Sequence, residues 1–274
     1  MLKLFVAIFF IWSSLFAQDD TLNSAVKSLM GAKAYNSNKQ LVSVVFRQQE
    51  SFYDGSNVNY LTVIKALKEN KLVDFSQKNV QNLNLSFSTD GAQLLSVKIV
   101  SDSLRDMGIF KYMIKESHLN SLEFEWSIEL NSENSLDPVN FGNQLLKYGC
   151  KIAKLDKSDN GNWIYKIDMK NAHLNAPILS ASNSIKTEHV ESEKWIDVSQ
   201  AGTINISSNH ANNWFPSISF YDQSLALIKV QKIDEKTTQL DVSVPSNAVY
   251  MKVTDIYTLK NIKNGLSFEV NTPR

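Results

Sequence analysis

The 274-residue chain has little cysteine, glycine, proline or histidine. Cys150 is the only cysteine, so no intramolecular disulfide can form and the fold must be held by its core. The 9 glycines are scattered, which argues against a glycine-rich phosphate-binding loop. The 4 histidines lie far apart, and no paired-cysteine, HExxH or calcium-loop spacing occurs. We therefore expect neither a metal site nor a cofactor.

Catalytic motifs are also missing from the sequence. There is no Gly-x-Ser-x-Gly turn to expose a serine nucleophile. Cys150 lies where a predicted helix ends and a strand begins, which is an ordinary buried position for a free thiol. The sequence thus contains no motif that identifies a catalytic residue, and it predicts a non-enzymatic protein. An envelope hydrolase that brings carboxylates together from separate loops is an alternative that one sequence leaves open.

The charges of the chain balance, with 28 basic and 28 acidic residues. A protein that binds nucleic acid or an anionic membrane surface through its charge would carry a basic excess. We therefore expect no nucleic-acid partner. Of the 28 basic residues, only Arg47, Arg105 and Arg274 are arginine, a bias typical of an AT-rich bacterial genome.

The first 17 residues, MLKLFVAIFFIWSSLFA, have the pattern of a secretory signal peptide. A single cation at Lys3 precedes an apolar run over residues 4–12, which is too short to span a bilayer comfortably. We expect cleavage after Ala17, a mature chain that begins near Gln18, no transmembrane segment after processing, and a periplasmic location. Because Leu15 is larger than a typical processing site prefers, an uncleaved N-terminal anchor is the alternative.

Residues 18–170 predict an α+β domain in which a helix followed by two strands occurs three times. The three predicted units cover residues 57–88, 91–130 and 137–169, and the two strands of the first and third units are expected to form hairpins with turns near residues 77–79 and 159–161. In the second, Phe124, Trp126 and Ile128 alternate with polar residues, as in a strand with one buried face. In the third, Asp137 is placed to cap the helix and Pro138 suits its first turn.

The assignment of residues 41–47 decides how the first half is subdivided. If they form a strand, residues 41–116 read β-α-β-β-α-β and residues 121–169 read β-α-β-β, as two subdomains. The first order is ferredoxin-like, and residues 41–169 resemble small periplasmic α+β modules of secretion and cell-wall machinery in topology only. Leu41, Val44 and Val45 also fit one face of a helix, which would remove that first strand.

The pattern changes in the second half of the chain. Residues 171–184 predict a linker or crossover, in which the apolar residues 177–179 could lie on a surface. From residue 185 onwards short strands alternate with polar turns, which predicts an all-β antiparallel sandwich or jelly roll over residues 185–274.

Two short segments give this half a similarity to known modules. The first segment is a predicted loop with the sequence Asn212-Asn213-Trp214-Phe215-Pro216, followed by Tyr221-Asp222. The second is the run over residues 250–255, most of which is predicted to form a strand. On these segments residues 185–271 resemble galactose-binding-like and other carbohydrate-binding β-sandwich modules, in which an aromatic ring stacks on a sugar. The resemblance implies a ligand-binding or partner-binding site made by Trp214, Asn212, Asn213, Tyr221, Asp222 and His210. Since Trp214 and Phe215 are neighbours, at most one can fill the core, and a purely structural role for Trp214 is the alternative.

Together these features favour a non-enzymatic bacterial interaction or scaffold protein of the cell envelope. We expect it to bind an envelope protein through the C-terminal sandwich. A glycan-binding or peptidoglycan-binding module is the first alternative.

Overall fold

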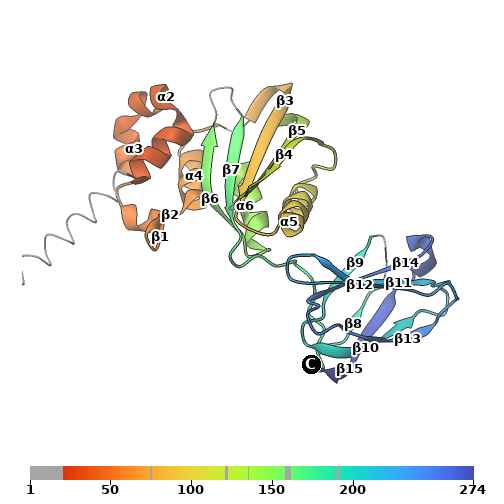
Figure 1. Ribbon diagram of the computed structural model, residues 1–274. Helices are drawn as coiled ribbons and strands as arrows, with labels where there is room; N and C mark the ends of the chain where they lie inside the picture. Colours follow the sequence, from red (N-terminus) through yellow and green to blue (C-terminus); the bar gives the residue numbers. More distant parts are fainter. Residues whose placement is uncertain are drawn as a thin grey trace, which may run out of the picture. The chain divides into compact units, whose positions relative to one another are not determined.

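The computed structural model describes residues 21–74, 76–120, 123–134, 136–157, 162–188, 190 and 192–274. The predicted signal peptide lies outside these residues. The chain forms two compact units, each with helices or strands of its own (Figure 1). The first comprises residues up to 91 and 96–172; the second comprises residues 173–274 with 92–95. The protein is therefore of mixed α/β class, with several antiparallel sheets.

The first unit begins with a mainly helical segment. Its elements are a helix over residues 21–30, α2 (Ala32–Ser37), α3 (Lys39–Val45), the 3-10 turn η1 (Gln49–Phe52), the hairpin β1 (Tyr53–Asp54) and β2 (Asn57–Val58), and α4 (Tyr60–Glu69). The first helix buries Leu22, Val26 and Leu29, which share one face at helical spacing. Phe46 packs against Phe52 with ring centroids 4.7 Å apart and the ring planes tilted by 52°. These apolar side chains thus form the buried interior of the segment.

The strand interpretation of residues 41–47 is wrong, because α3 occupies most of this stretch. The amide of Phe46 donates to the Val42 carbonyl at 2.9 Å, which is a helical bond between residues four apart. Val42 is the buried residue of α3, whereas Leu41 and Val44 remain exposed. The β-α-β-β-α-β order predicted for residues 41–116 therefore falls with this strand.

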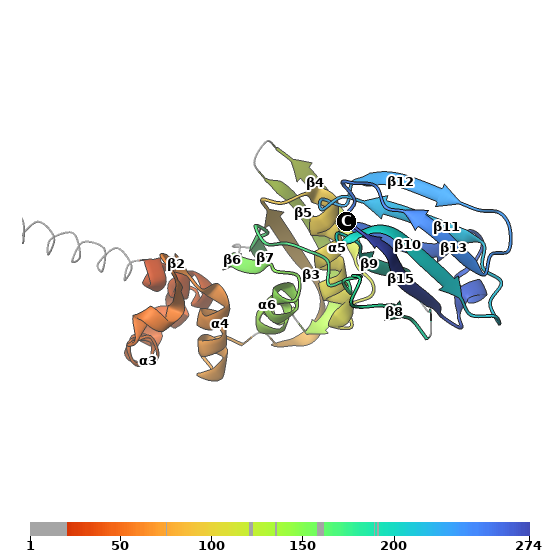
Figure 2. The same ribbon diagram turned by 90° about the horizontal axis from the view of Figure 1, so that it is seen from below.

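A five-stranded sheet forms the centre of the first unit (Figures 1 and 2). Its elements are β3 (Ser76–Thr89), α5 (Gln93–Asp106), β4 (Met113–Leu119), β5 (Phe124–Asn134), α6 (Pro138–Leu146), β6 (Lys151–Lys157) and β7 (Trp163–Asp168). The strand order is β4-β5-β3-β7-β6, in which β3 and β7 are parallel and the other neighbours antiparallel. Asp137 caps α6 as predicted, since its carboxylate accepts from the Val139 amide at 3.1 Å.

Residues 71–88 do not form the hairpin predicted for the first helix-strand-strand unit. They contain one long strand, β3, which pairs with β5 on one side and with β7 on the other. The partners of β3 lie about 40 and 80 residues further along the chain, at Leu85↔Ile128 and Leu85↔Trp163. Such long-range pairing leaves no trace in a local pattern, so the turn expected near residues 77–79 was an error.

The sheet of the first unit has one apolar and one polar face. On the apolar face the rings of Phe87, Trp126, Phe141 and Tyr165 pack together, with centroids 5.1–5.8 Å apart. Phe141 belongs to α6, which covers this face. The opposite face carries Ser86, Ser127 and Lys166, which no described helix covers.

The second unit contains two four-stranded antiparallel sheets, β13-β10-β15-β8 and β12-β11-β14-β9. Its elements are β8 (Ile185–Lys186), β9 (Lys194–Asp197), β10 (Ala201–Ser208), β11 (Pro216–Tyr221), β12 (Leu227–Lys232), β13 (Gln239–Ser243), β14 (Tyr250–Asp255), η2 (Leu259–Ile262) and β15 (Leu266–Pro273). Ile204 and Phe268 from the first sheet share one hydrophobic core with Ile218 and Val253 from the second. Each sheet therefore buries one face and leaves the other outside.

Most of the segment predicted as a linker, residues 173–184, packs against the second unit. The Leu179 side chain is fully buried and its amide donates to the Asp197 carbonyl at 2.9 Å. The Asp197 amide in turn donates to the Pro177 carbonyl at 3.0 Å. Residues 177–179 are thus packed onto the second unit, which is the alternative that the sequence left open.

Candidate functional sites

The structure places Trp214 in the core of the second unit. Its ring has no exposed surface, and its Nε1 donates to the Thr254 carbonyl at 3.1 Å. Phe215, its neighbour, is half-buried and meets Tyr257 edge-on, with centroids 5.2 Å apart. Trp214 therefore has no free face on which a sugar could stack. Its position fits the alternative of a purely structural role.

The polar residues predicted around Trp214 do not converge on a common pocket. Asn212 is buried, and its amide donates to Ser208 Oγ at 3.1 Å and to the Gly265 carbonyl at 2.8 Å. His210 and Asn213 are exposed on either side of it.

Asp222 serves as a turn residue. Its carboxylate accepts from the amides of Ser224 at 2.8 Å and Ala226 at 2.9 Å. Burial by itself would raise the pKa of Asp222, but the hydrogen bonds from Ser224 and Ala226 outweigh it and hold this pKa below its ordinary value. The hydrogen bonds of this carboxylate thus stabilise the turn.

Tyr221, also a predicted site residue, belongs to a different cluster on the outer face of the β12-β11-β14-β9 sheet. Its ring lies 4.9 Å from that of Trp195 on β9, centroid to centroid. Lys252 of β14 places its Nζ over Trp195, 5.6 Å from the ring centroid, and pairs with Glu193 at 3.2 Å. This geometry is that of a cation–π contact.

Exposed aliphatic residues of β12 lie beside these rings. β12 is the edge strand of the sheet, and its Leu227 and Val230 side chains are 57% and 43% exposed. Leu227 pairs with Tyr221, and Val230 shares a row with Lys252 and Trp195 through Ser219 of β11. We call the surface made by Trp195, Tyr221, Leu227, Val230 and Lys252 the aromatic face.

The sequence contained a signal for part of this face. Along residues 194–198, Trp195 alternates with Ile196 and Val198, which are buried. Alternation thus placed Trp195 on the outside. Its meeting with Tyr221 and Lys252 depends on the order of the strands in the sheet, which the sequence did not reveal.

The first unit contains a groove of about 860 Å³, which we call the β6 groove. One wall comes from β6, which contributes Lys151, Ile152, Ala153, Lys154 and Asp156. The opposite wall comes from the helix over residues 21–30 and from the β1–β2 hairpin, with polar side chains such as Ser24, Ser28 and Asn57. Most of the residues that line the groove are polar or charged, and aliphatic residues such as Leu61, Leu146 and Ile152 complete its lining.

Several charges of the β6 groove pair with one another. Lys151 Nζ lies 2.5 Å from the Asp54 carboxylate, and the hydrogen bond and charge of Asp54 raise the pKa of Lys151 above its ordinary value. Asp156 accepts from Ser28 Oγ at 2.9 Å and pairs with Lys154 at 2.5 Å. These contacts join the two walls of the groove.

Asp90 and Asp168 lie at the carboxyl ends of the parallel strands β3 and β7. Thr89 and Ile167 are partners across these strands, so the two aspartates follow at adjacent positions. One oxygen of Asp90 accepts from the Met169 amide at 3.1 Å, and one oxygen of Asp168 from the Lys170 amide at 3.0 Å. Both carboxylates line the β6 groove, and no ion pair is found for either within the described residues.

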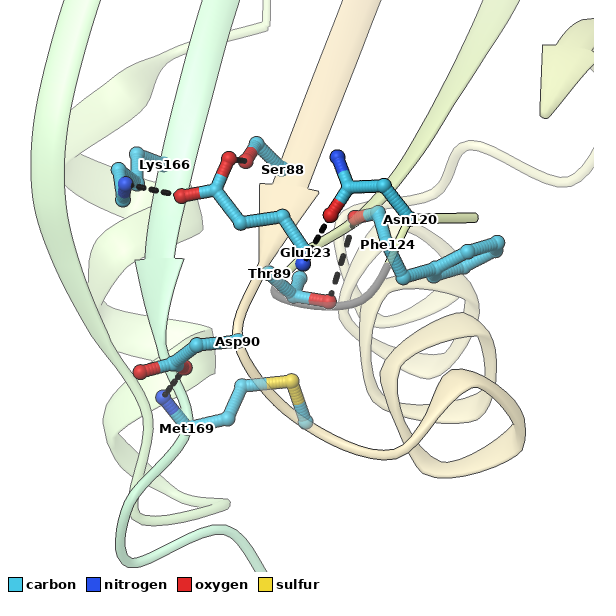
Figure 3. Close-up of polar contacts among 8 residues, drawn as sticks. All are labelled: Ser88, Thr89, Asp90, Asn120, Glu123, Phe124, Lys166 and Met169. Atoms are coloured by element: carbon cyan, nitrogen blue, oxygen red, sulfur yellow. Dashed lines mark hydrogen bonds and ion pairs between the residues drawn. The ribbon is translucent and has the colours of Figure 1, made fainter. Parts of the chain in front are cut away.

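A Ser-Glu-Lys cluster lies on the polar face of the same sheet (Figure 3). Glu123 receives a hydrogen bond from Ser88 Oγ at 3.2 Å and an ion pair from Lys166. The hydrogen bond and charge of Lys166 lower the pKa of Glu123, while Glu123 raises that of Lys166. Lys166 therefore stays protonated and cannot act as a base toward Ser88, so the cluster is no serine–lysine catalytic pair.

Cys150, the free thiol of the chain, lies in the core. Cys150 is buried, and this burial raises the pKa of its thiol to about 12, with Asp168 and Asp90 adding to the shift. The thiolate, which is the reactive form, is thus scarce near neutral pH. Across the described residues, no three His, Cys, Asp or Glu side chains come together as metal ligands. No helix in this part of the chain is long and apolar enough to cross a membrane.

No family model matches the chain, and no curated protein matches it. Among solved structures, a chain from "Crystal structure of accessory secretory protein 1,2 and 3 in Streptococcus pneumoniae" is similar to part of it. The similarity has 13% identity and a TM-score of 0.19, and it covers 27% of this chain and 53% of that one. It spans about half the length of the other protein, and at this TM-score it carries no argument about fold or function.

Proposed function

We propose that the protein is a non-enzymatic interaction protein of the bacterial cell envelope that binds a protein partner through the aromatic face. The observation that carries this proposal is the combination of two aromatic rings, an ammonium group and two exposed aliphatic side chains on one sheet face. Tryptophan and tyrosine dominate the binding energy of protein interfaces, and aliphatic neighbours exclude water around them. The face lies on an edge strand, so a partner could also add a strand beside β12.

The same geometry makes a glycan a weaker candidate for this face. A sugar ring stacks on an open aromatic surface, but the Lys252 ammonium already lies over Trp195. The aliphatic Leu227 and Val230 offer no hydrogen bonds to sugar hydroxyls. These features favour a protein partner.

The proposal includes export to the periplasm, which rests on the signal peptide pattern of residues 1–17. N-terminal sequencing of the native protein tests it: a start near Gln18 supports processing, and a start at Met1 contradicts it.

We also propose an interpretation of the two units as repeated and layered modules. We interpret α5-β4-β5 and α6-β6-β7 as two copies of the helix-plus-hairpin unit and the two sheets of the second unit as the predicted β-sandwich. A repeated unit and a two-sheet module are common building blocks for proteins that present surfaces rather than catalyse reactions.

The test is a pull-down from the native envelope with the tagged mature chain, carried out in parallel with Leu227→Asp/Val230→Asp and with Gln239→Asp. Leu227 and Val230 are exposed, so their replacement should leave the fold intact, and Gln239 is an exposed residue of the edge strand of the other sheet. We expect a partner protein that the wild type and Gln239→Asp retain and the double variant loses. Equal capture by all three forms, or retention on purified peptidoglycan instead of a protein, would contradict the proposal.

A further inference from the structure

We propose that the β6 groove is a second binding site, which takes an extended peptide segment with basic side chains. This site lies within the first unit and is independent of the aromatic face. Three observations carry it: the size of the groove, an unpaired strand edge on its wall, and two carboxylates at one end that no ion pair neutralises.

The groove has the dimensions of a ligand site. Its volume of about 860 Å³ is within the roughly 300–1,000 Å³ usual for such sites. The groove follows β6 from Lys151 to Asp156, so this wall extends about 20 Å at roughly 3.3 Å per residue. A cavity that follows a strand over this length suits an elongated ligand.

The β6 wall offers main-chain hydrogen bonds. β6 is the last strand of the sheet and pairs only with β7 among the described residues. Within the part of the chain that the structure describes, no main-chain hydrogen bond outside that pair involves residues 151–156. A register shift between Ile152 and Lys154 leaves Ala153 without a partner on β7, and Ala153 and Lys154 are exposed. An extended peptide could use these free groups by adding a strand, as in other peptide-binding sheets.

The charges of the groove favour a ligand with positively charged side chains. Lys151 and Lys154 are held by Asp54 and Asp156, and Lys166 by Glu123. Asp90 and Asp168 each use one oxygen for a main-chain amide and keep the other. Once these three ion pairs are set aside, Asp90, Asp168 and Lys170 are the charges that remain in the described lining, so the end near β3 and β7 has an excess of one negative charge. A lysine or arginine side chain of the peptide would neutralise it with charge-assisted hydrogen bonds.

The experiment uses the full mature chain and two blocked octapeptides as probes, acetyl-(Lys-Thr)4-amide and acetyl-(Glu-Thr)4-amide. Affinity is measured by calorimetry at low ionic strength, and protection of main-chain amides by hydrogen exchange. We expect the lysine peptide to bind at least tenfold more tightly than the glutamate peptide. We also expect its binding to protect amides of residues 152–155.

The matched variants are Asp90→Asn/Asp168→Asn and Glu269→Gln. The asparagines keep an oxygen for the amides of Met169 and Lys170, so the fold is retained, and Glu269 is an exposed residue of β15 in the other unit. The double variant should lose about tenfold or more in affinity for the lysine peptide, the change expected for a lost charge-assisted contact, while Glu269→Gln should lose nothing. Absence of binding, equal affinity for both peptides, protection away from β6, or an unchanged double variant would each overturn the proposal. None of these outcomes depends on the partner of the aromatic face.

Discussion

Trp214 is the largest fully buried side chain of the described residues and stabilises the second unit. Replacing it by alanine removes a ring that fills the core and leaves a cavity, and it also removes the hydrogen bond to Thr254. We expect Trp214→Ala to lower the free energy of unfolding by about 3–5 kcal/mol. Denaturant melts that follow the second unit measure this loss.

Phe215→Ala is the matched control, because Phe215 is adjacent in sequence yet half-buried. Its effect should be clearly smaller than that of Trp214→Ala. If the tryptophan variant changed stability by no more than about 0.5 kcal/mol, as at a surface position, the burial of Trp214 would be refuted.

The pair Trp214 and Phe215 shows how far a residue can be interpreted from sequence. Their adjacency predicted that at most one of them fills the core, because neighbours on a strand point to opposite faces. Which one does so depends on the Thr254 carbonyl, 40 residues away on β14, which satisfies the indole nitrogen. That partner is supplied by the sheet and is invisible in the local sequence.

Glu123 gives a prediction for the pH dependence of stability. Lys166 holds the pKa of Glu123 below its ordinary value of 4.5 in the folded protein. The stabilisation is therefore complete above the unfolded-state pKa and is lost as the pH falls through the lower folded-state pKa. We expect Glu123→Gln to be less stable than the wild type near pH 7 and equal to it in strong acid.

Urea melts of both proteins over a pH series test this expectation. Glu269→Gln is the control, because Glu269 is an exposed glutamate of the second unit for which no ion pair is found within the described residues. A difference between wild type and Glu123→Gln that grew as the pH fell would contradict the assigned ion pair.

At the scale of elements, the close packing of α4 on α6 depends on Gly142. A Cβ built on this glycine would lie 2.6 Å from Cδ1 of Leu61 on α4 and 3.2 Å from Cδ1 of Ile152 on β6. Alanine favours a helix more than glycine does, by about 1 kcal/mol, but the overlap with the half-buried Leu61 and the buried Ile152 outweighs this gain. The overlap costs roughly 1–3 kcal/mol and the helix gain offsets about 1 kcal/mol, so we expect Gly142→Ala to destabilise the first unit by up to about 2 kcal/mol.

Asn143→Ala is the control for this effect, since Asn143 is the next residue of α6 and is exposed. The substitution raises helix propensity without an overlap, so stability should stay equal or rise slightly. Thermal melts of the two variants and the wild type separate the effect of helix propensity from the effect of the overlap. A Gly142→Ala variant more stable than the wild type would refute the tight contact.

Elements whose pattern is local were predictable, and those set by distant partners were not. The helix at residues 138–146 followed from the Asp137 cap and its apolar spacing. Residues 41–47 were ambiguous because only Val42 of α3 is buried, so a one-sided pattern hardly exists there. In β3, pairing with β5 and β7 determines a strand where the local sequence indicated a turn.

At the scale of the molecule, the candidate sites were the least predictable features. The aromatic face unites Trp195, Tyr221 and Lys252 from three strands, and the β6 groove unites residues of the first helix with β6 more than 120 positions later. Each residue alone has an ordinary pattern. Only the strand order makes them neighbours.

The division into two compact units predicts where the native chain is cut. Lys170 and Asn171 are exposed, and the boundary between the units falls between Ala172 and His173. From Leu174 onwards the chain is bound to the second unit: the Leu174 amide donates to the Tyr250 hydroxyl at 3.0 Å, and β8 pairs with β15. Brief trypsin treatment of the native protein should therefore cut after Lys170 well before it cuts after Lys186, because cleavage needs an exposed segment that can leave its contacts.

The expected products are two fragments that meet at residue 171 and remain folded, identified by mass spectrometry and by hydrogen exchange. Lys170→Gln provides the control, since it removes the cleavage site without altering the backbone hydrogen bonds of the region. This variant should survive the treatment that divides the wild type. First cleavage at Lys186, or rapid degradation of either fragment, would show that residues 174–186 are not held by the second unit and that the units do not fold as described.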